Sequence, residues 1–385
     1  MGQGRILTRG TRAFGALVCA ALGLLSAAWI IRDLDKADET SHLWWTWSGL
    51  TRGPWGGIYG SGLVDLMLLV LCVFTGATAL RSPAAAGALA TLGVVTVALR
   101  LPALWTVEAD WLDMLRISDG VRTRAVLTGW AGVLLGIALL VAVAVGRRPA
   151  GAAAPGYTPP GHPAPLADEP PTVPTPGAGA LAMLFLGGAA GVIGAWQIYW
   201  AQEWGWDVYK HLLSGERVFT TLLAPPPAWA AWSLILLTLG AAVAAGKRTD
   251  YARPLGMTAA TLVLIDGISS TSVFFKVEFV QHFDDLPTRE TLNVLSAFFE
   301  VLAGLVALTA LAQRGLRPGE SWPGSGWAAP AAPWYGAAPA GYGPPSAPSG
   351  YGPSGGGYAP GPVPPPPSTP PPGTPPPPSS PPPGW

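Results

Sequence analysis

Four charged residues lie within or beside long apolar runs of the sequence, namely Arg100, Asp266, Glu300 and Asp65. A charge at the centre of a bilayer costs at least about 2.5–3.5 kcal/mol on insertion scales, so such residues face the interior of a helix bundle and find partners. Asp266 and Glu300 are predicted near mid-depth on adjacent spans, and Arg100 and Asp65 nearer the outer side. Two interpretations stay open. One is a polar path or a proton- or ion-coupled site. The other is hydrogen bonding between helices, with one acid protonated or paired with Arg100.

Motifs for enzymatic chemistry are absent from the sequence. There is no phosphate-binding loop, no dinucleotide fingerprint, no nucleophile elbow, no HExxH and no CxxC. His42, His211 and His282 fall in loops without ligand spacing, so no metal site is predicted. Cys19 and Cys72 lie inside apolar runs and are expected to be buried hydrophobic residues. We therefore expect neither an enzyme nor a cofactor.

The composition predicts an integral membrane protein. Half of the 385 residues are hydrophobic and only 11% are charged, against roughly 25% in soluble domains. The formal net charge is zero, which gives no general attraction to nucleic acid. The expected partner is therefore the lipid bilayer.

Eight apolar runs are long enough to cross the hydrocarbon core, which needs about 20 residues of helix. They are continuous rather than alternating, so they favour helices over barrel strands. The predicted fold class is an all-α integral membrane protein with eight transmembrane helices. The predicted spans are Ala13–Ile31, Gly62–Leu80, Ala84–Thr106, Arg124–Gly146, Ala178–Trp200, Ala228–Gly246, Leu255–Phe275 and Thr291–Ala312.

The loops between these spans differ in charge. Arginine and lysine gather in the short loops and termini on one side, whereas the longer loops on the other side are acidic or mixed. Because cytoplasmic loops carry an excess of basic residues, the sequence predicts a plasma-membrane protein with both termini in the cytoplasm.

The spans form two similar halves. Ala28-Trp29-x-Ile31 near the end of the first span corresponds to Ala195-Trp196-x-Ile198 near the end of the fifth. Val126-Leu127 and Gly136 correspond in the same way to Val294-Leu295 and Gly304. The common order and almost constant spacing predict a tandem, parallel duplication of a four-helix unit. The predicted parts are a first half (1–149), a Pro/Ala/Gly-rich linker (150–177), a second half (178–313) and a tail (314–385).

Tryptophans cluster around the predicted outer loops. Because an indole ring sits well at the headgroup level, we interpret them as an interfacial belt, with a carbohydrate- or lipid-binding surface as the alternative. The belt comprises Trp45, Trp47, Trp105, Trp200, Trp204 and Trp206. Two glycine pairs, Gly132-x-x-x-Gly136 and Gly187-x-x-x-Gly191, allow close helix contact within the bundle or in a homo-oligomer.

The tail beyond Arg317 repeats Pro, Gly, Ser and Tyr or Trp and ends in proline runs. It cannot bury a core and is expected to be disordered. The tail resembles those of actinobacterial envelope proteins, and the excess of arginine over lysine in the whole chain is typical of the same group. We therefore hypothesise a non-enzymatic membrane protein that engages cytoplasmic partners through this tail. The alternative is an ion- or proton-coupled transporter or channel-like protein that uses the intramembrane charges.

Overall fold

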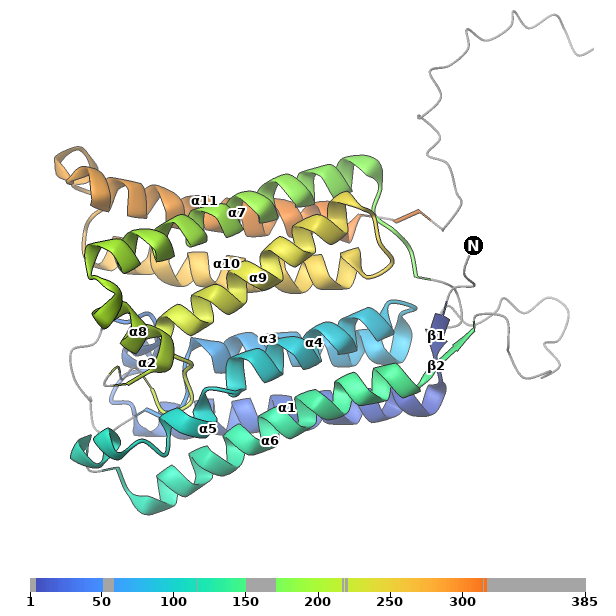
Figure 1. The fold of residues 1–385 in the computed structure, drawn as a ribbon, viewed down its shortest axis with the longest axis horizontal. Helices are drawn as coiled ribbons and strands as arrows, with labels where there is room; N and C mark the ends of the chain where they lie inside the picture. The colour runs from blue at the N-terminus through green and yellow to red at the C-terminus, as the bar shows by residue number, and fades with distance from the viewer. Residues whose placement is uncertain are drawn as a thin grey trace, which may run out of the picture. The chain divides into compact units, whose positions relative to one another are not determined.

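The computed structural model describes residues 5–50, 59–115, 117–149, 171–216, 218, 221–313 and 315–316. Within them, eight helices are long and apolar enough to cross a membrane, which confirms the predicted number. They fall into two groups that lie side by side (Figure 1). The first bundle contains α1 (Arg9–Lys36), α3 (Leu63–Arg81), α4 (Ala85–Arg100) and α6 (Asp119–Val145). The second bundle contains α7 (Pro176–Glu203), α9 (Pro227–Gly246), α10 (Ala252–Lys276) and α11 (Thr288–Ala312).

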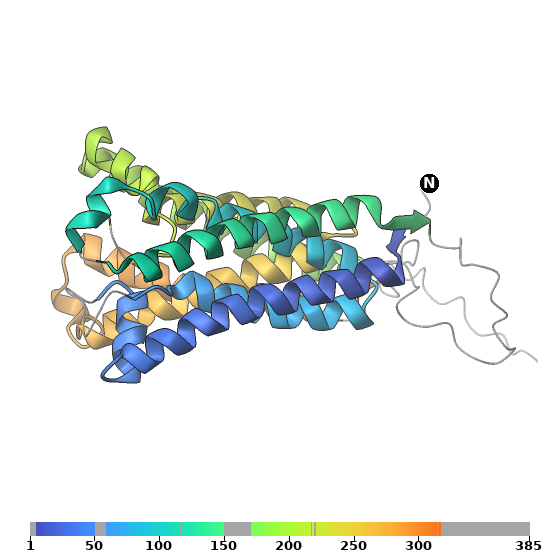
Figure 2. The ribbon, with the colours of Figure 1, turned by 90° about the horizontal axis from the view of Figure 1, so that it is seen from below.

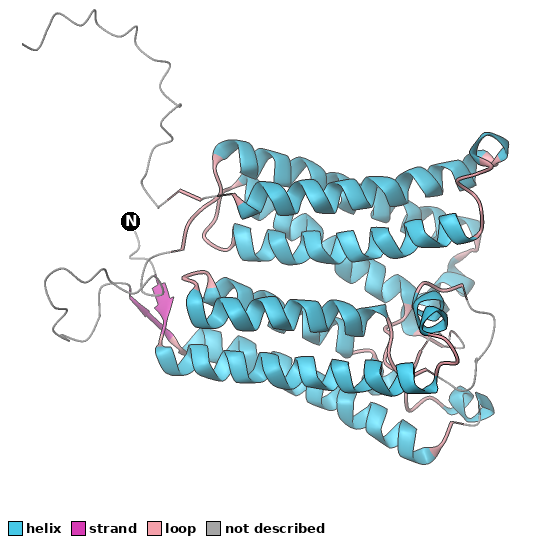
Figure 3. Ribbon diagram, turned by 180° about the vertical axis from the view of Figure 1, so that it is seen from behind, coloured by secondary structure: helices cyan, strands magenta, loops and turns pink. Residues whose placement is uncertain are grey.

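The axes of the long helices are roughly aligned, while the chain direction alternates from one helix to the next (Figure 2). Short elements lie at the two ends of the helices. One end, called here the loop end, carries α2 (Thr40–Trp47), α5 (Ala103–Thr106), η1 (Asp110–Leu115), α8 (Trp206–Ser214) and η3 (Phe283–Asp285). The opposite end, the basic end, carries the antiparallel strands β1 (Arg5–Leu7) and β2 (Arg147–Pro149), shown in Figure 3. This ribbon joins the start of α1 to the end of α6.

The helices extend past the predicted spans where polar residues follow the apolar run. α1 continues to Lys36, α7 to Glu203 and α10 to Lys276, because a charged turn at a helix end can remain helical while it reaches the polar interface. The predicted span Ala84–Thr106 corresponds to one candidate span, Ala85–Thr106, within which only Leu101 and Pro102 separate α4 from α5. Pro102 follows the end of α4 and lacks an N–H for the helix ladder, so the chain restarts as α5.

Each bundle has the same pattern of helix neighbours. In the first bundle α1 packs on α3 and α6, and α4 packs on α3 and α6. In the second, α7 packs on α9 and α11, and α10 packs on α9 and α11. Glycines make the tightest crossings: Gly136 of α6 lies against Gly93 and Val97 of α4, and Gly304 of α11 lies against Ala260 and Leu264 of α10. The pair Gly132-x-x-x-Gly136 therefore packs inside the first bundle.

Two polar contacts recur in both bundles. Trp29 Nε1 of α1 donates to Thr128 Oγ1 of α6 at 3.0 Å. Trp196 Nε1 of α7 donates to Ser296 Oγ of α11 at 2.9 Å. The first helix of each bundle is also capped by a threonine: Thr8 accepts from Thr11 N and Thr175 from Ala178 N. The two tryptophans belong to the repeated Ala-Trp-x-Ile sequence.

The bundles meet along α4, α10, α3 and α9. Near the loop end, hydrogen bonds cross this seam. Trp44 Nε1 donates to Ser272 Oγ at 2.9 Å, and Trp229 Nε1 donates to the carbonyl of Ala98 at 2.8 Å. The backbone N–H of Leu223 donates to the carbonyl of Gly60 at 3.0 Å. Towards the basic end the contact is apolar, because Pro254 of α10 packs closely against Gly87 of α4.

The glycine crossing of α10 and α11 gives a first prediction. A Cβ at Gly304 would lie 2.7 Å from Leu264 Cβ and 2.9 Å from the carbonyl oxygen of Ala260. Gly304→Ala should therefore lower the free energy of unfolding by about 1–3 kcal/mol, since the helices must separate. Thermal unfolding of the purified chain in detergent measures this.

Gly191→Ala of α7 is the matched control, because nothing lies within 4 Å of a Cβ at Gly191. We expect it to leave the unfolding midpoint unchanged or raise it, since alanine favours helix. Equal midpoints for the two variants would contradict the close crossing.

Candidate functional site

The four predicted intramembrane residues separate into two pairs. Arg100 at the end of α4 forms an ion pair with Asp65 in the first turn of α3. Both side chains are buried, with exposed fractions of 3% for Arg100 and 0% for Asp65. Asp266 of α10 and Glu300 of α11 lie together in the second bundle. Arg100 is thus paired with Asp65 and makes no ion pair with Asp266 or Glu300 in the described part of the chain.

Further hydrogen bonds satisfy the Arg100–Asp65 pair. Asp65 accepts from the backbone N–H of Gly62 at 2.9 Å, which caps α3. Arg100 Nη1 donates to the carbonyl of Leu223 at 3.3 Å, and Nη2 donates to Ser26 Oγ at 3.4 Å. The guanidinium therefore ties together α1, α3, α4 and the segment that precedes α9. These contacts connect three helices of the first bundle to the segment before α9 of the second.

Asp266 and Glu300 have a different environment. Gly267 lets α11 approach α10 so closely that a Cβ at this position would lie 3.0 Å from Glu300 Cβ. The two carboxyl groups are near enough to repel each other when both are charged. Among the described residues neither one forms a salt bridge or a side-chain hydrogen bond that could neutralise it. Both instead line a cavity.

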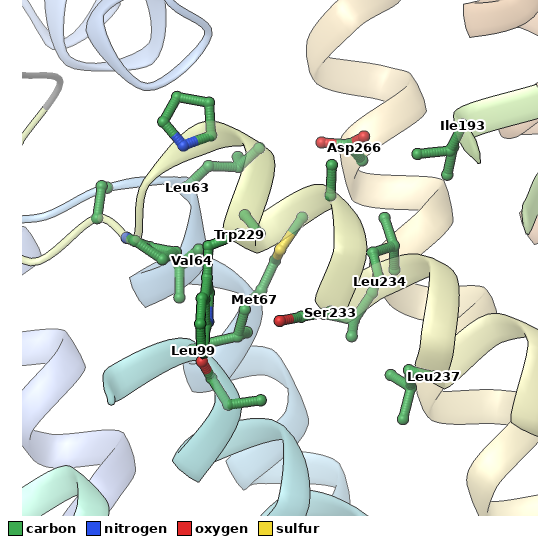
Figure 4. A pocket seen from close by; sticks show the side chains of 18 of the residues that line it. Leu63, Val64, Met67, Leu99, Ile193, Trp229, Ser233, Leu234, Leu237 and Asp266 are labelled. Atoms are coloured by element: carbon green, nitrogen blue, oxygen red, sulfur yellow. The ribbon is translucent and has the colours of Figure 1, made fainter. Parts of the chain in front are cut away.

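The cavity lies in the seam between the bundles and has a volume of about 820 Å³. Helices α3 and α4 of the first bundle and all four helices of the second contribute to its wall. Figure 4 shows side chains of both bundles turned toward the same space, among them Met67 and Leu99 from one and Trp229, Ser233 and Asp266 from the other. The cavity is therefore a feature of the assembled halves and of neither half alone.

The cavity wall is apolar apart from a few groups. Its ionisable lining residues are Asp266 and Glu300. Neutral polar side chains are contributed by Thr46, Gln197, Thr221, Ser233, Ser270 and Asn293. A largely apolar pocket with a few convergent polar groups is typical of small-molecule sites. The arrangement can bind a proton or a cation at the carboxyl pair and apolar groups along the remaining wall.

Four tryptophans line the cavity, and two of them, Trp47 and Trp200, belong to the predicted belt. Trp47 Nε1 donates to the carbonyl of Ser61 at 3.1 Å. Trp200 stacks between Trp196 and Trp204, with ring centroids 5.7 Å and 4.5 Å away. The N–H groups of Trp196 and Trp229 are bonded as described above. These indoles are therefore fixed in place.

The other belt residues lie at the loop end outside the cavity wall. Trp204 and Trp206 are exposed, and Trp105 is exposed but donates to the carbonyl of Ser214 at 2.8 Å. Lys276 lies over the ring of Trp45, 5.6 Å from its centroid. Of the predicted belt, Trp47 and Trp200 therefore line the cavity, Trp105, Trp204 and Trp206 are exposed, and Trp45 is half-buried.

Three residues of this region were missed as site residues from the sequence. Trp196 and Trp229 line the cavity, and only the repeated Ala-Trp-x-Ile pattern around Trp196 marked that position as special. Asp33 follows the predicted span Ala13–Ile31 and belongs to the first of the acidic loops in the sequence, yet it is fully buried. Its carboxylate accepts from Gly60 N at 2.8 Å, Ser61 N at 2.6 Å and Ser61 Oγ at 2.7 Å. No sequence signal distinguished it from the neighbouring loop acids.

Comparison with protein-family models found no match, and searches of curated proteins and of solved structures found none either. Functional inference therefore rests on the geometry of the cavity and of the charges around it.

The buried ion pair gives a second prediction. Arg100→Met should lower the free energy of unfolding by about 3–5 kcal/mol, because it leaves the carboxylate of Asp65 buried without its counterion. The double variant Arg100→Met/Asp65→Asn should recover part of this loss. The measurement is thermal unfolding in detergent.

The control is Lys210→Met, which removes a partner of Asp207 in an exposed pair on α8. Exposed pairs contribute little to stability, so its unfolding midpoint should match that of the unmodified chain. An Arg100→Met midpoint equally close to the unmodified value would show that the pair does not stabilise the fold.

Proposed function

We propose that this membrane protein is a cation- or proton-coupled transporter or channel-like protein whose binding site is the cavity in the seam. The observation that supports it most is the placement of Asp266 and Glu300. Two neighbouring carboxyl groups face a cavity of about 820 Å³, and none of the described residues that line it is basic. Carboxylates in a membrane interior need a counterion, and here a proton or a bound cation would supply it.

The location in the seam supports transport rather than a purely structural role. A structural acid would be expected to pair with a base, as Asp65 does with Arg100. Alternating access in many transporters arises when one helix bundle rocks against the other around a site between them. In this chain the wall comes from both bundles, so relative movement of the bundles would alter access to the carboxyl pair.

We further propose that the protein lies in the plasma membrane with its basic end in the cytoplasm. Arg9, Arg12, Arg81, Lys247 and Arg248 lie at or near the basic end. Acidic side chains such as Asp110, Asp113, Asp207, Asp284 and Asp285 lie at the loop end. By the positive-inside rule, this distribution of charge supports a cytoplasmic location for the basic end, and we propose the same for both termini. The exposed tryptophans would lie at the outer lipid headgroups.

A tandem duplication is also proposed, supported by contacts that recur at corresponding positions. The hydrogen bonds Trp29–Thr128 and Trp196–Ser296 link the first and last helices of each bundle. Antiparallel pairing closes each bundle at the basic end, through β1 and β2 in the first and through Val173 and Leu316 in the second. Unrelated four-helix units would have no reason to share these details.

The tail hypothesis stays a prediction from sequence, because residues 317–385 and most of the linker lie outside the described residues. A cytoplasmic protein that docks on the proline-rich segments is compatible with transport. The two activities would use separate parts of the chain.

The duplication predicts equivalent roles for the two tryptophans. Trp29→Phe and Trp196→Phe should each lower the free energy of unfolding by about 0.5–1.5 kcal/mol, the net contribution of one hydrogen bond. Denaturant or thermal unfolding of each purified variant measures this. A loss seen in one variant and not in the other would argue against equivalent positions.

The transport proposal is tested in liposomes that contain the full-length chain and an internal pH indicator. An imposed membrane potential should drive proton uptake into these liposomes faster than into empty ones. Asp266→Asn/Glu300→Gln should reduce the rate to that of empty liposomes, because the acidic groups of the cavity are gone.

Asp207→Asn removes a carboxylate whose side chain is 92% exposed at the loop end, and it should leave proton uptake unchanged. The proposal fails if the double variant inserts in equal amount and keeps the full rate. It also fails if the unmodified chain gives no uptake above the background.

A further inference from the structure

We infer that the seam cavity binds an amphiphilic organic cation, with the cationic group at Asp266 and Glu300 and the apolar part against the helix walls. The inference rests on the proposed function, since it names the class of substrate for the same cavity.

The size of the cavity favours an organic molecule over a metal ion. Its volume of about 820 Å³ falls within the roughly 300–1,000 Å³ of pockets that bind drug-sized ligands. A metal ion needs several converging oxygen, nitrogen or sulfur ligands. The described residues contain no cluster of three or more His, Cys, Asp or Glu that could supply them.

The charge of the wall selects for cations. Within the part of the chain that the structure describes, the two carboxyl groups are the ionisable groups of the lining, and no lysine, arginine or histidine contributes to it. An anion would meet repulsion and no counterion. A zwitterionic lipid could place its amine at the acids, but its phosphate would find no basic partner in this wall. The complementary ligand therefore carries positive charge alone.

The tryptophans provide surfaces that attract such a ligand. The N–H groups of Trp47, Trp196 and Trp229 are already bonded to protein oxygens. Their contribution to a ligand therefore comes from the ring surfaces, which attract cations and apolar groups alike. Trp229 and Asp266 border the same space in Figure 4. A cation near Asp266 would thus have both a carboxylate and an aromatic neighbour.

The edge of the cavity indicates where the ligand enters. Val94 of α4 and Leu236 of α9 line the cavity, yet their side chains are 49% and 68% exposed. Both lie within membrane-spanning helices, where exposed side chains face lipid. An amphiphile dissolved in the bilayer can therefore reach the cavity from the side, between α4 and α9.

Binding of tritiated tetraphenylphosphonium to the purified full-length chain in a neutral detergent tests the inference, with empty micelles as background. Tetraphenylborate is the control ligand, because it has the same shape and the opposite charge. We expect saturable tetraphenylphosphonium binding that unlabelled tetraphenylphosphonium displaces and tetraphenylborate does not. Asp266→Asn/Glu300→Gln should weaken binding by about tenfold or more, and Asp207→Asn should leave it unchanged.

A matched pair of glycine variants tests the location without altering charge. Gly240 of α9 lines the cavity, Gly191 of α7 does not, and a Cβ at either position meets nothing within 4 Å. Gly240→Phe should therefore fill part of the cavity and weaken tetraphenylphosphonium binding, whereas Gly191→Phe should not. This comparison stays decisive if the carboxyl double variant fails to fold.

Three results would overturn the inference: no saturable tetraphenylphosphonium binding, equal displacement by tetraphenylborate, or equal affinity in the two glycine variants. Proton uptake that depends on Asp266 and Glu300 would still support the proposed function in that case. Conversely, carboxyl-dependent tetraphenylphosphonium binding without carboxyl-dependent proton uptake would support the binding site and contradict transport.

Discussion

A charged group buried in an apolar layer must find a partner of opposite charge, and the arrangement of this protein follows from how each group meets that requirement. The carboxylate of Asp65 and the guanidinium of Arg100 neutralise each other, and the remaining donors of Arg100 bond Ser26 and Leu223. This contact fixes the loop-end parts of α1, α3 and α4, and it reaches across the seam to the segment before α9. The seam is therefore held by hydrogen bonds near the loop end, and the cavity lies in the same seam.

Each bundle has a helix crossing at which a glycine packs against an ionisable side chain, but the side chain is basic in the first bundle and acidic in the second. In the first bundle Arg100 of α4 lies against Gly132 of α6. In the second bundle Glu300 of α11 lies against Gly267 of α10. At each crossing a glycine makes room for the stem of an ionisable side chain, but the helix that bears the charge is exchanged and its sign is reversed. If the bundles descend from a duplicated unit, as we propose, the same space now holds a structural cation in one half and an acid of the cavity in the other.

The sequence predicted the helices far better than their pairings. Long continuous apolar runs specify eight spans because a helix satisfies its own backbone in lipid, and the sequence placed Asp266 and Glu300 near mid-depth on adjacent spans. Depth does not specify which face of a helix meets which neighbour. Arg100 was accordingly considered as a partner for Asp266 or Glu300, whereas the structure pairs it with Asp65. Asp33 was missed for a related reason. It is buried because Gly60 and Ser61, which are distant in sequence, pack against it and donate hydrogen bonds to its carboxylate.

The contrast between the two pairs explains why function is assigned to the seam. Removing one member of the Asp65–Arg100 pair would leave the other buried without its counterion, so the loss of a single member should cost stability. Asp266 and Glu300 have no basic partner among the described residues, and two carboxylates held together would repel each other if both were charged. Proteins retain such arrangements chiefly where activity requires them. In the function that we propose, the carboxyl pair and the tryptophans that border the same cavity are the groups that a ligand would contact.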